Sequence, residues 1–280
     1  MIYPAATRMP ARVQEVGAYM DWLYTASGFA VGLIVGITGV GGGSLMTPLL
    51  VLFFGVAPAT AVGTDLLYAS LTKTLGGWVH SRNGTVDWKV VGLLSLGSFP
   101  AALATIALLK YLALDEKTLR GLVTGVLSVA LLSTATALLL KDWIKQLARR
   151  KDGTVYELHH RYLPAATIAT GVVVGALVTV SSIGAGVLGT VALLFLYPRM
   201  ASVKVVGTDI VHAVPLTAVA GMGHMALGTV NFVLLGSLLL GSLPGIYIGS
   251  HLSAKVPEKV LRPVLAAMLL IIGLKMLFYK

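Results

Sequence analysis

The sequence contains no cysteine and few charged residues. Of its 280 residues, 11% are charged and 56% are hydrophobic, and the mean hydropathy is +0.88. An average soluble domain is about 25% charged, so this composition excludes an ordinary water-soluble globular fold. Without cysteine the chain has no disulfide, no thiolate metal ligand and no cysteine nucleophile.

Two common enzyme motifs are also missing. The sequence holds no GxxxxGK[ST], which would predict an ATP-binding loop, and no HExxH, which would predict a zinc protease. We therefore expect no cofactor and no metal, and we do not expect an enzyme. The net charge of +10 would indicate a polyanionic partner in a soluble protein. Here the basic residues lie mostly between apolar runs, so we expect no nucleic-acid partner.

Apolar segments make up nearly all of the chain beyond residue 20. A spanning helix needs roughly 20 apolar residues, and we identify eight segments. The sequence therefore predicts an all-α polytopic membrane protein, multi-pass in the cytoplasmic membrane, with the lipid bilayer around it. The segments are 22–54, 58–80, 88–110, 118–140, 162–197, 202–225, 229–250 and 259–278.

One polar stretch divides the apolar chain into two parts. Residues 141–161 contain six Lys and Arg residues, and the positive-inside rule places this basic loop in the cytoplasm. We expect a short N-terminal arm at 1–21, a first membrane repeat at 22–140 and a second at 162–280.

The two parts match each other at a constant offset. Gly63-Thr64-Asp65 returns 144 residues later as Gly207-Thr208-Asp209, and His80 returns as His224. Gly84-Thr85-Val86 likewise returns as Gly228-Thr229-Val230. The sequence thus predicts two homologous four-segment repeats, a design typical of secondary transporters with a site at the repeat interface.

The first segment of each repeat is too long for one simple span and carries a Gly/Ser-rich stretch near its middle. These stretches are GITGVGGGS at 36–44 and TVSSIGAG at 179–186. Glycine weakens helices, and opened backbone in a membrane must face protein or a watery cavity. We therefore expect each segment to be two half-helices that meet at a buried break.

The breaks are candidate anion sites, because a helix N-terminus presents free N–H groups and positive partial charge. The alternative is that the glycines only allow helices to pack closely. The expected substrate-binding residues are Gly41, Gly42, Gly43, Ser44, Thr47, Thr64, Gly184, Gly186, Thr190 and Thr208.

Five ionisable residues lie within or at the ends of apolar segments. Asp65 and Asp209 are candidates for a coupling proton, because carboxylates inside a membrane are costly and often functional. Lys73, His80 and His224 are further candidates for proton or ion coupling. Helix capping, interhelical hydrogen bonds and interfacial positions remain as alternatives. Asp65 and His80 lie about 22 Å apart along one helix, too far to hold one small ligand.

The orientation of the repeats depends on the broken segments. If each broken segment crosses the membrane once, the repeats are parallel. If each one re-enters, every half has three true crossings and the repeats are inverted. The distribution of basic residues decides nothing between these two arrangements, so both stay open here.

Taken in order, these motifs resemble the TauE/SafE-type family of sulfite and organosulfonate exporters. The resemblance covers about residues 22–279 and rests on GxGGGS, VGTD, HxxxGTVDW, GSFP, the basic central loop, and GSLPG with LRP in the second half. It implies a cytoplasmic-membrane permease that moves small sulfur anions by a secondary mechanism. The second break departs from the first by losing two glycines.

We therefore expect a secondary transporter that exports a small sulfur-containing anion and is proton-coupled through Asp65 or Asp209. The main alternative is a cation carrier in which these two aspartates hold the ion. An intramembrane enzyme and a scaffold protein are further alternatives from other classes. A homodimer is compatible with the sequence, although no residue argues for it.

Overall fold

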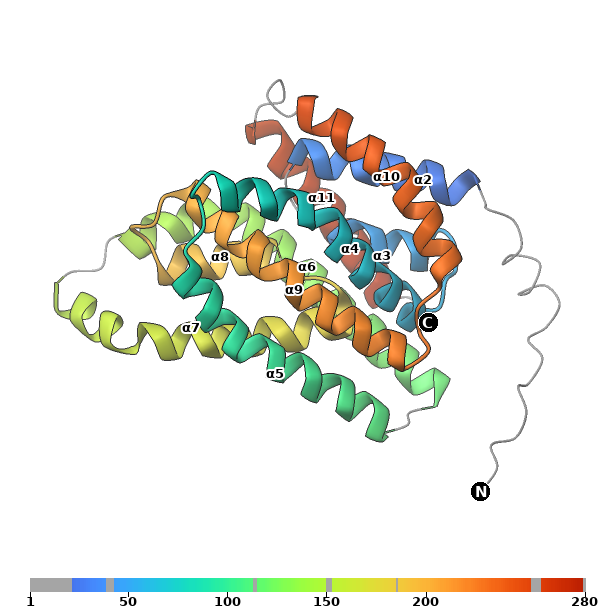
Figure 1. Cartoon of the computed structure of the whole chain (residues 1–280), viewed down its shortest axis with the longest axis horizontal. Helices are drawn as coiled ribbons and strands as arrows, with labels where there is room; N and C mark the ends of the chain where they lie inside the picture. The colour runs from blue at the N-terminus through green and yellow to red at the C-terminus, as the bar shows by residue number, and fades with distance from the viewer. Residues whose placement is uncertain are drawn as a thin grey trace.

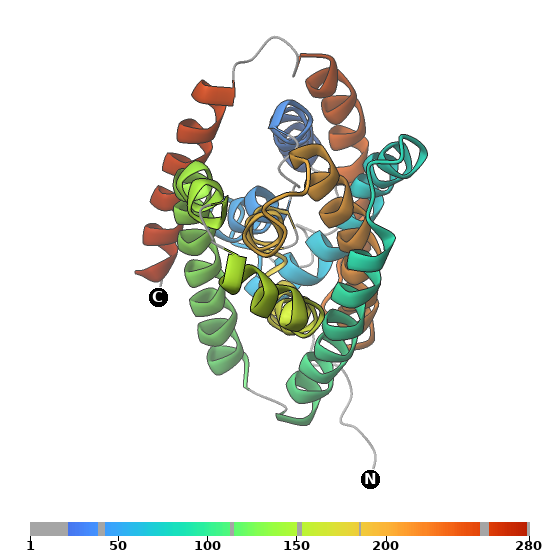
Figure 2. The same cartoon turned by 90° about the vertical axis from the view of Figure 1, so that its left-hand side faces the viewer.

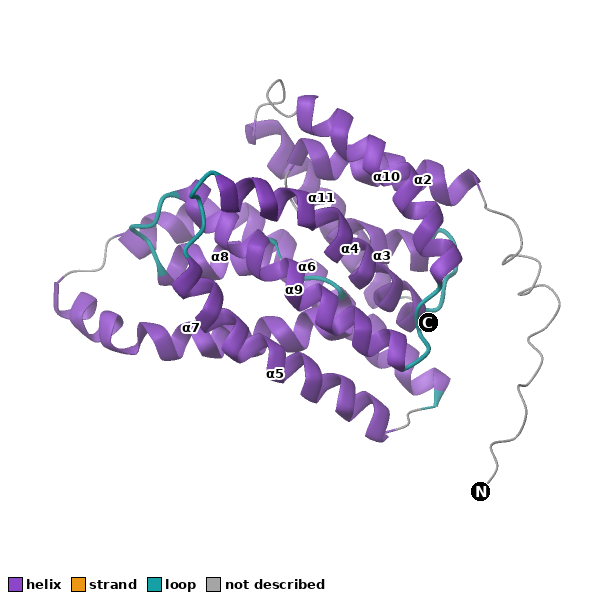
Figure 3. Ribbon diagram, viewed as in Figure 1, coloured by secondary structure: helices purple, strands orange, loops and turns teal. Residues whose placement is uncertain are grey.

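The fold is entirely helical in the part of the chain that the structure describes (Figure 3). The computed structural model describes residues 22–38, 43–112, 115–149, 153–184, 186–252 and 258–278. These residues form ten helices and no strand, which confirms the predicted all-α class. The N-terminal arm at 1–21 lies outside the described residues.

The ten helices follow the predicted segments closely. Segment 22–54 is two helices, segment 162–197 lies within two more, and each of the other six segments corresponds to one helix. In order they are α2 (Trp22–Thr38), α3 (Gly43–Leu52), α4 (Pro58–Arg82), α5 (Trp88–Leu112), α6 (Glu116–Arg149), α7 (Gly153–Ser181), α8 (Val187–Leu196), α9 (Ser202–Ala226), α10 (Phe232–Leu252) and α11 (Glu258–Leu277).

The stretch at 141–161, expected as a loop, is mostly helical. α6 continues to Arg149 and α7 begins at Gly153, while residues 150–152 lie outside the described residues. The sequence KDWIKQLAR at 141–149 is rich in good helix formers, so a polar composition does not end the helix there.

Five of the described helices contain an apolar stretch long enough to cross a membrane, and they lie in α5, α6, α7, α9 and α10. Large apolar side chains face outward along them. Leu96 and Leu103 of α5, for example, are 66% and 58% exposed. Such a surface is unfavourable in water and favourable against lipid. The chain is therefore a multi-pass membrane protein.

Helices of one half pair closely with helices of the other half. α2 lies along α10, where Gly28 packs on the Leu238 backbone (Figures 1 and 2). The matching pair is α7 along α5, where Gly171 packs on the Leu94 backbone. A Cβ atom at either glycine would strike a carbonyl oxygen, so these small residues allow the close approach.

α4 and α9, the equivalent helices of the two halves, run antiparallel. Gly63 near the start of α4 lies against Thr229, just beyond the end of α9. Gly207 near the start of α9 lies in the same way against Thr85, just beyond the end of α4. Equivalent helices that pack antiparallel are related by a pseudo-two-fold axis perpendicular to both of them. The two halves that contain these helices therefore have inverted orientation.

The inverted arrangement requires the broken helices to re-enter. α2 runs in the same direction as α10, because Gly28 meets Leu238 and Gly32 meets Ser242, one turn further along both helices. α10 follows α9 by a short turn and so runs with α4. Since α2 and α4 both cross in one direction, α3 must turn back between them, and α8 must do the same between α7 and α9.

The two membrane faces follow from this topology. α4, α6, α8 and α10 end at one face, which we call the basic face, and α3, α5, α9 and α11 end at the opposite face. Among the described residues, and leaving Lys73 aside, ten Lys and Arg residues belong to the basic face and four to the opposite one. The positive-inside rule then predicts that the basic face is cytoplasmic.

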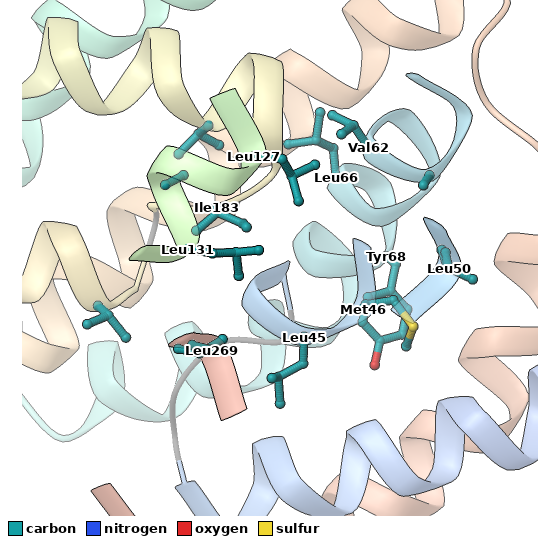
Figure 4. Packing of buried hydrophobic residues seen from close by; sticks show 14 of the residues in the cluster. Leu45, Met46, Leu50, Val62, Leu66, Tyr68, Leu127, Leu131, Ile183 and Leu269 are labelled. Carbon is teal, nitrogen blue, oxygen red and sulfur yellow. The ribbon is translucent and has the colours of Figure 1, made fainter. Parts of the chain in front are cut away.

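The buried core is continuous across both halves and reaches the break between α7 and α8. Ile183, inside that break, lies beside Leu127 and Leu131 of α6 (Figure 4). All three side chains are fully buried. Apolar packing therefore holds the opened backbone in place from the α6 side.

Candidate functional site

Asp65 is buried in the second turn of α4 and is held by the half-helix before it. The Thr47 hydroxyl of α3 donates a hydrogen bond of 2.5 Å to Asp65 Oδ2. Both residues have no exposed surface, and Asp65 Oδ1 has no hydrogen-bond partner. A carboxylate accepts several hydrogen bonds, so this oxygen has unused capacity in a closed interior.

Asp209 of α9 repeats this arrangement. The Thr190 hydroxyl of α8 donates a hydrogen bond of 3.0 Å to Asp209 Oδ2, and Asp209 Oδ1 has no partner. Gly189 brings α8 close, because a Cβ atom there would strike Asp209 Oδ1. Each half-helix therefore supplies a threonine that fixes one carboxylate and leaves its second oxygen unpaired.

The break between α7 and α8 is held by unusual backbone conformations. Ser182 has φ 57°, Gly184 has φ 121° and Gly186 has φ 143°. These values lie in the region that glycine tolerates best. Gly186 caps α8 without any side-chain hydrogen bond, so the first N–H groups of α8 have no side-chain partner at the cap.

Ser182 lies beside Asp65 across the two halves of the chain. Its hydroxyl is buried and makes no hydrogen bond of ordinary geometry. The break between α7 and α8 in the second half thus places the unpaired Ser182 hydroxyl beside Asp65 of the first half. Unsatisfied buried polar atoms are rare, and two of them, the Ser182 hydroxyl and Asp65 Oδ1, belong to neighbouring side chains here.

Lys73 of α4 interacts electrostatically with Asp209 and, more weakly, with Asp65. Its side chain is half-buried. The equivalent position in α9 is Thr217, which is buried and donates to the Ala213 carbonyl at 2.9 Å. One lysine therefore serves two carboxylates. We call Thr47, Asp65, Lys73, Ser182, Thr190 and Asp209 the central site.

His212 is a buried polar residue near the central site that the sequence reasoning did not assign. Its Nε2 atom lies 2.8 Å from the Ser98 hydroxyl of α5, and both side chains are buried. Lys73 also acts on His212 electrostatically. This pair joins α9 to α5 and fills the space beside Lys73.

His80 and His224 hold loops rather than reach the carboxylates. His80 Nδ1 lies 2.8 Å from Thr85 Oγ1, and His224 Nδ1 lies 2.9 Å from Thr229 Oγ1. The His224 Nε2 atom also contacts the Thr179 carbonyl at 2.8 Å. Both histidines therefore close the turn after their own helix.

Thr64 and Thr208 connect the two halves. The Asn231 backbone N–H donates to Thr64 Oγ1 at 3.0 Å, and the Asp87 backbone N–H donates to Thr208 Oγ1 at 2.9 Å. Each hydroxyl thus anchors the loop that follows the helix of the other half. The structure does not direct these two hydroxyls to the unpaired carboxylate oxygens.

The glycines expected to bind substrate divide into two groups. Gly184 and Gly186 shape the described break before α8. Gly41 and Gly42 lie outside the described residues, and Gly43 and Ser44 form the first turn of α3.

Sequence reasoning missed Ser182 of the central site and Gly189, which lies against Asp209. A signal was present, because Ser182 lies in the second Gly/Ser-rich stretch and Gly189 stands directly before Thr190. Their role depends on contacts between the halves, which a single sequence does not display.

Two cavities lie on opposite faces. One of about 550 Å³ opens at the basic face between the α4–α5 loop, α7 and the α8–α9 loop. The other, of about 240 Å³, lies at the opposite face and is lined by Lys110, Val180 and His224 among others. The central site lies between these two faces, and its residues line neither cavity.

Comparison with known proteins gives one family. A family model described as Sulfite exporter TauE/SafE matches residues 24–276. The probable membrane transporter protein YjnA of Bacillus subtilis (strain 168) is 38% identical over 250 residues, covering 89% of this chain and 97% of that protein. YdhB of the same strain, also a probable membrane transporter protein, is 29% identical with 89% and 97% covered.

A more distant similarity extends beyond bacteria. The probable membrane transporter protein MJ0441 of Methanocaldococcus jannaschii is 25% identical over 270 residues, with 89% of this chain and 92% of that protein covered. No solved structure matches the chain significantly.

Proposed function

The chain belongs to the sulfite exporter TauE/SafE family, and on that premise we propose that it is a secondary transporter that exports a small sulfur-containing anion, such as sulfite or an organosulfonate. The family model is described as a sulfite exporter, and the relatives are named probable membrane transporter proteins. The observation that carries the choice of an anion is the central site, where Lys73 interacts with both buried carboxylates and the unpaired Ser182 hydroxyl lies beside Asp65.

The site offers donors that suit an oxyanion. Lys73 supplies a positive charge, Ser182 supplies a hydroxyl with no other partner, and the start of α8 supplies backbone N–H groups with positive partial charge. Oxyanions bind well where several such donors converge.

The balance of charge indicates a proton that travels with the anion. Two ionised carboxylates and one lysine leave one net negative charge, which would repel an anion. Taking these carboxyl groups out of water also disfavours their charged forms. A proton on Asp65 or Asp209 removes the repulsion between the site and the anion. The protonated carboxyl O–H then becomes a further hydrogen-bond donor. We propose that anion and proton bind together.

The inverted halves supply a route for alternating access. Inverted repeats allow one half to rock against the other so that a central site faces each side in turn. The Gly-lined contacts of α2 with α10 and of α7 with α5 are candidate rocking interfaces, because both join helices from different halves.

A cation carrier is the competing proposal, and two carboxylates with unpaired oxygens favour it. Lys73 opposes it, since an ammonium group beside both carboxylates would repel a bound cation. The described residues also contain no group of three or more His, Cys, Asp or Glu side chains able to hold a metal.

Flux in proteoliposomes tests the proposal. Vesicles loaded with sulfite, taurine, sulfoacetate or thiosulfate are diluted into anion-free buffer, and efflux is compared with protein-free vesicles at two opposite proton gradients. We expect protein-dependent efflux of one sulfur anion, faster when the lumen is more acidic than the outside. Chloride-loaded vesicles are the matched control.

Three results would contradict parts of the proposal. Acceleration by the opposite gradient would show exchange of the anion for a proton rather than joint movement. Efflux that does not depend on the proton gradient would show that no proton moves with the anion. No efflux of any sulfur anion from correctly inserted protein, together with flux of a cation, would overturn the anion proposal.

A further inference from the structure

The cavity at the basic face is not explained by the central site. Its volume is about 550 Å³, well above what an inorganic oxyanion needs. It is lined by three cationic residues, Lys89, Arg199 and Lys204, with a single carboxylate, Asp87. The rest of the lining is largely apolar and includes Val90, Leu93, Leu163, Pro164, Leu196 and Met200.

The fold does not require these charges. Because the halves are inverted, an equivalent place exists at the opposite face, built from residues 144 positions earlier or later. At that place Asn231 is the counterpart of Asp87, Val233 of Lys89 and Thr60 of Lys204. The backbone anchors survive this change, since Asn231 N–H binds Thr64 as Asp87 N–H binds Thr208.

The loop before α9 shows the same difference. Residues 197–201 include Arg199, whereas the equivalent loop at 53–57 reads FFGVA and has no charge. Lys89, Arg199 and Lys204 therefore have no charged counterparts at the equivalent positions of the other half. A feature that the fold can do without, and that gathers three cations around a cavity, indicates a ligand.

The ion pair in the cavity leaves its lysine available. Lys204 Nζ lies 3.4 Å from Asp87 Oδ2, and the two side chains are 41% and 28% exposed. A pair that water reaches adds little stability, so an anion can compete for Lys204. Asp87 keeps its other contact, because its Oδ1 accepts a hydrogen bond from the Val90 N–H at the start of α5.

The cavity is linked to the central site through α9, which contributes a residue to each. Lys204 is five residues before Asp209 on α9, which is about 7.5 Å along the helix axis. Thr208, between them, donates to the Lys204 carbonyl at 2.6 Å and receives the Asp87 N–H. A ligand that displaces Asp87 from Lys204 would act on the turn of α9 that leads to Asp209.

We propose that this cavity is a second binding site, which takes an organic anion with a sulfonate-type head and a short apolar stem before it reaches the central site. Lys89, Arg199 and Lys204 bind the head, and the apolar floor binds the stem. The loading role rests on the proposed function, whereas binding in the cavity does not.

An anionic phospholipid carries the same chemistry, a charged head on an apolar stem, so the experiment must separate the two sources. Purified full-length protein is placed in nanodiscs of phosphatidylcholine alone, and 1-butanesulfonate binding is measured by calorimetry. Sulfate lacks the stem and 1-butanol lacks the charge, so both serve as ligand controls. A second arm repeats the titration in nanodiscs that contain phosphatidylglycerol.

We expect butanesulfonate to bind in phosphatidylcholine nanodiscs, more tightly than sulfate or butanol. The variant R199Q/K204Q should bind it at least about tenfold more weakly, since charged hydrogen-bonded contacts are lost. The matched control is K117Q, which removes an exposed lysine at the opposite face and should leave binding unchanged.

Two outcomes overturn this inference. Equal affinity in R199Q/K204Q and the natural protein would place the ligand elsewhere. Binding of phosphatidylglycerol without any binding of butanesulfonate would make the cavity a lipid site. If butanesulfonate binds but no sulfur anion is transported, the cavity site stands and the proposed function fails.

In flux assays of a transported organosulfonate, R199Q/K204Q should raise KM and leave kcat unchanged.

Discussion

The two buried carboxylates occupy equivalent places, yet their surroundings differ. Each accepts a hydrogen bond from a half-helix threonine and keeps one oxygen unpaired. Lys73, however, lies on α4 and has Thr217 as its counterpart on α9. It interacts more strongly with Asp209 than with Asp65. Asp65 instead has the Ser182 hydroxyl beside it.

This difference indicates a division of roles between the halves. Duplication provides two matching scaffolds, and a single lysine makes them unequal. Because one ammonium group cannot fully neutralise two carboxylates, one of them is expected to bind the proton. Ser182 can accept or donate a hydrogen bond beside Asp65 whether that carboxyl group is charged or neutral. As part of the proposed function, we therefore propose that Asp65 binds the proton, while Lys73 keeps its electrostatic interaction with Asp209.

Replacing Lys73 should have the largest effect. K73M leaves two buried carboxylates without their cation, and removing one partner of a buried pair costs about 3 kcal/mol or more. We expect anion flux in proteoliposomes to fall on the order of 100-fold. K117Q provides a control for the general loss of positive charge. Flux within about twofold of the natural protein would remove Lys73 from the mechanism.

Neutralising the carboxylates one at a time should separate them. D65N should abolish the acceleration of efflux by an acidic lumen and leave downhill anion exchange intact, because the amide mimics the protonated acid. D209N should keep the gradient response and tighten anion binding, because Lys73 loses its competing partner. Measuring flux at several proton gradients checks both, and the reverse pattern would exchange the two roles.

The close approach of α8 to Asp209 should be sensitive to one methyl group. G189A places a Cβ atom against Asp209 Oδ1, so we expect a loss of transport of about tenfold through displaced geometry. G236A in α10 is the matched control, since nothing lies within 4 Å of its added Cβ. Equal flux in both variants would show that α8 shifts away from Asp209 without loss of transport.

The threonines should matter least. T47V and T190V each delete one hydrogen bond to a carboxylate, and such a bond is worth about 1 kcal/mol. We expect each substitution to reduce the rate about fivefold. T217V, whose hydroxyl binds its own helix backbone, should have no effect on flux. A loss with T217V as large as with T47V would indicate a general packing defect.

Local patterns in the sequence predict much of the fold. Apolar run length predicts the helices, and the glycines at 179–186 predict the break before α8. Composition also places Asp65 and Asp209 inside the membrane, which makes them visible as candidates.

The inverted packing could not be predicted, because it depends on whether α3 and α8 turn back. Only contacts between the halves, such as Gly63 with Thr229, decide that question. The same contacts engage Thr64 and Thr208 with loops of the other half. In the sequence, Lys89, Arg199 and Lys204 are separate charges with no shared motif, because their convergence on a cavity arises from tertiary structure.

Accessibility of the central site from the two faces tests the account most directly. The chain has no cysteine, so S182C is a single-cysteine variant without further changes. It is labelled in oriented proteoliposomes with a membrane-impermeant thiol reagent added from one side or the other. Sulfoacetate is the protecting anion, since sulfite itself consumes such reagents. The account predicts labelling from both faces and protection by the transported anion. Labelling from one face alone, or labelling that no anion reduces, would contradict it.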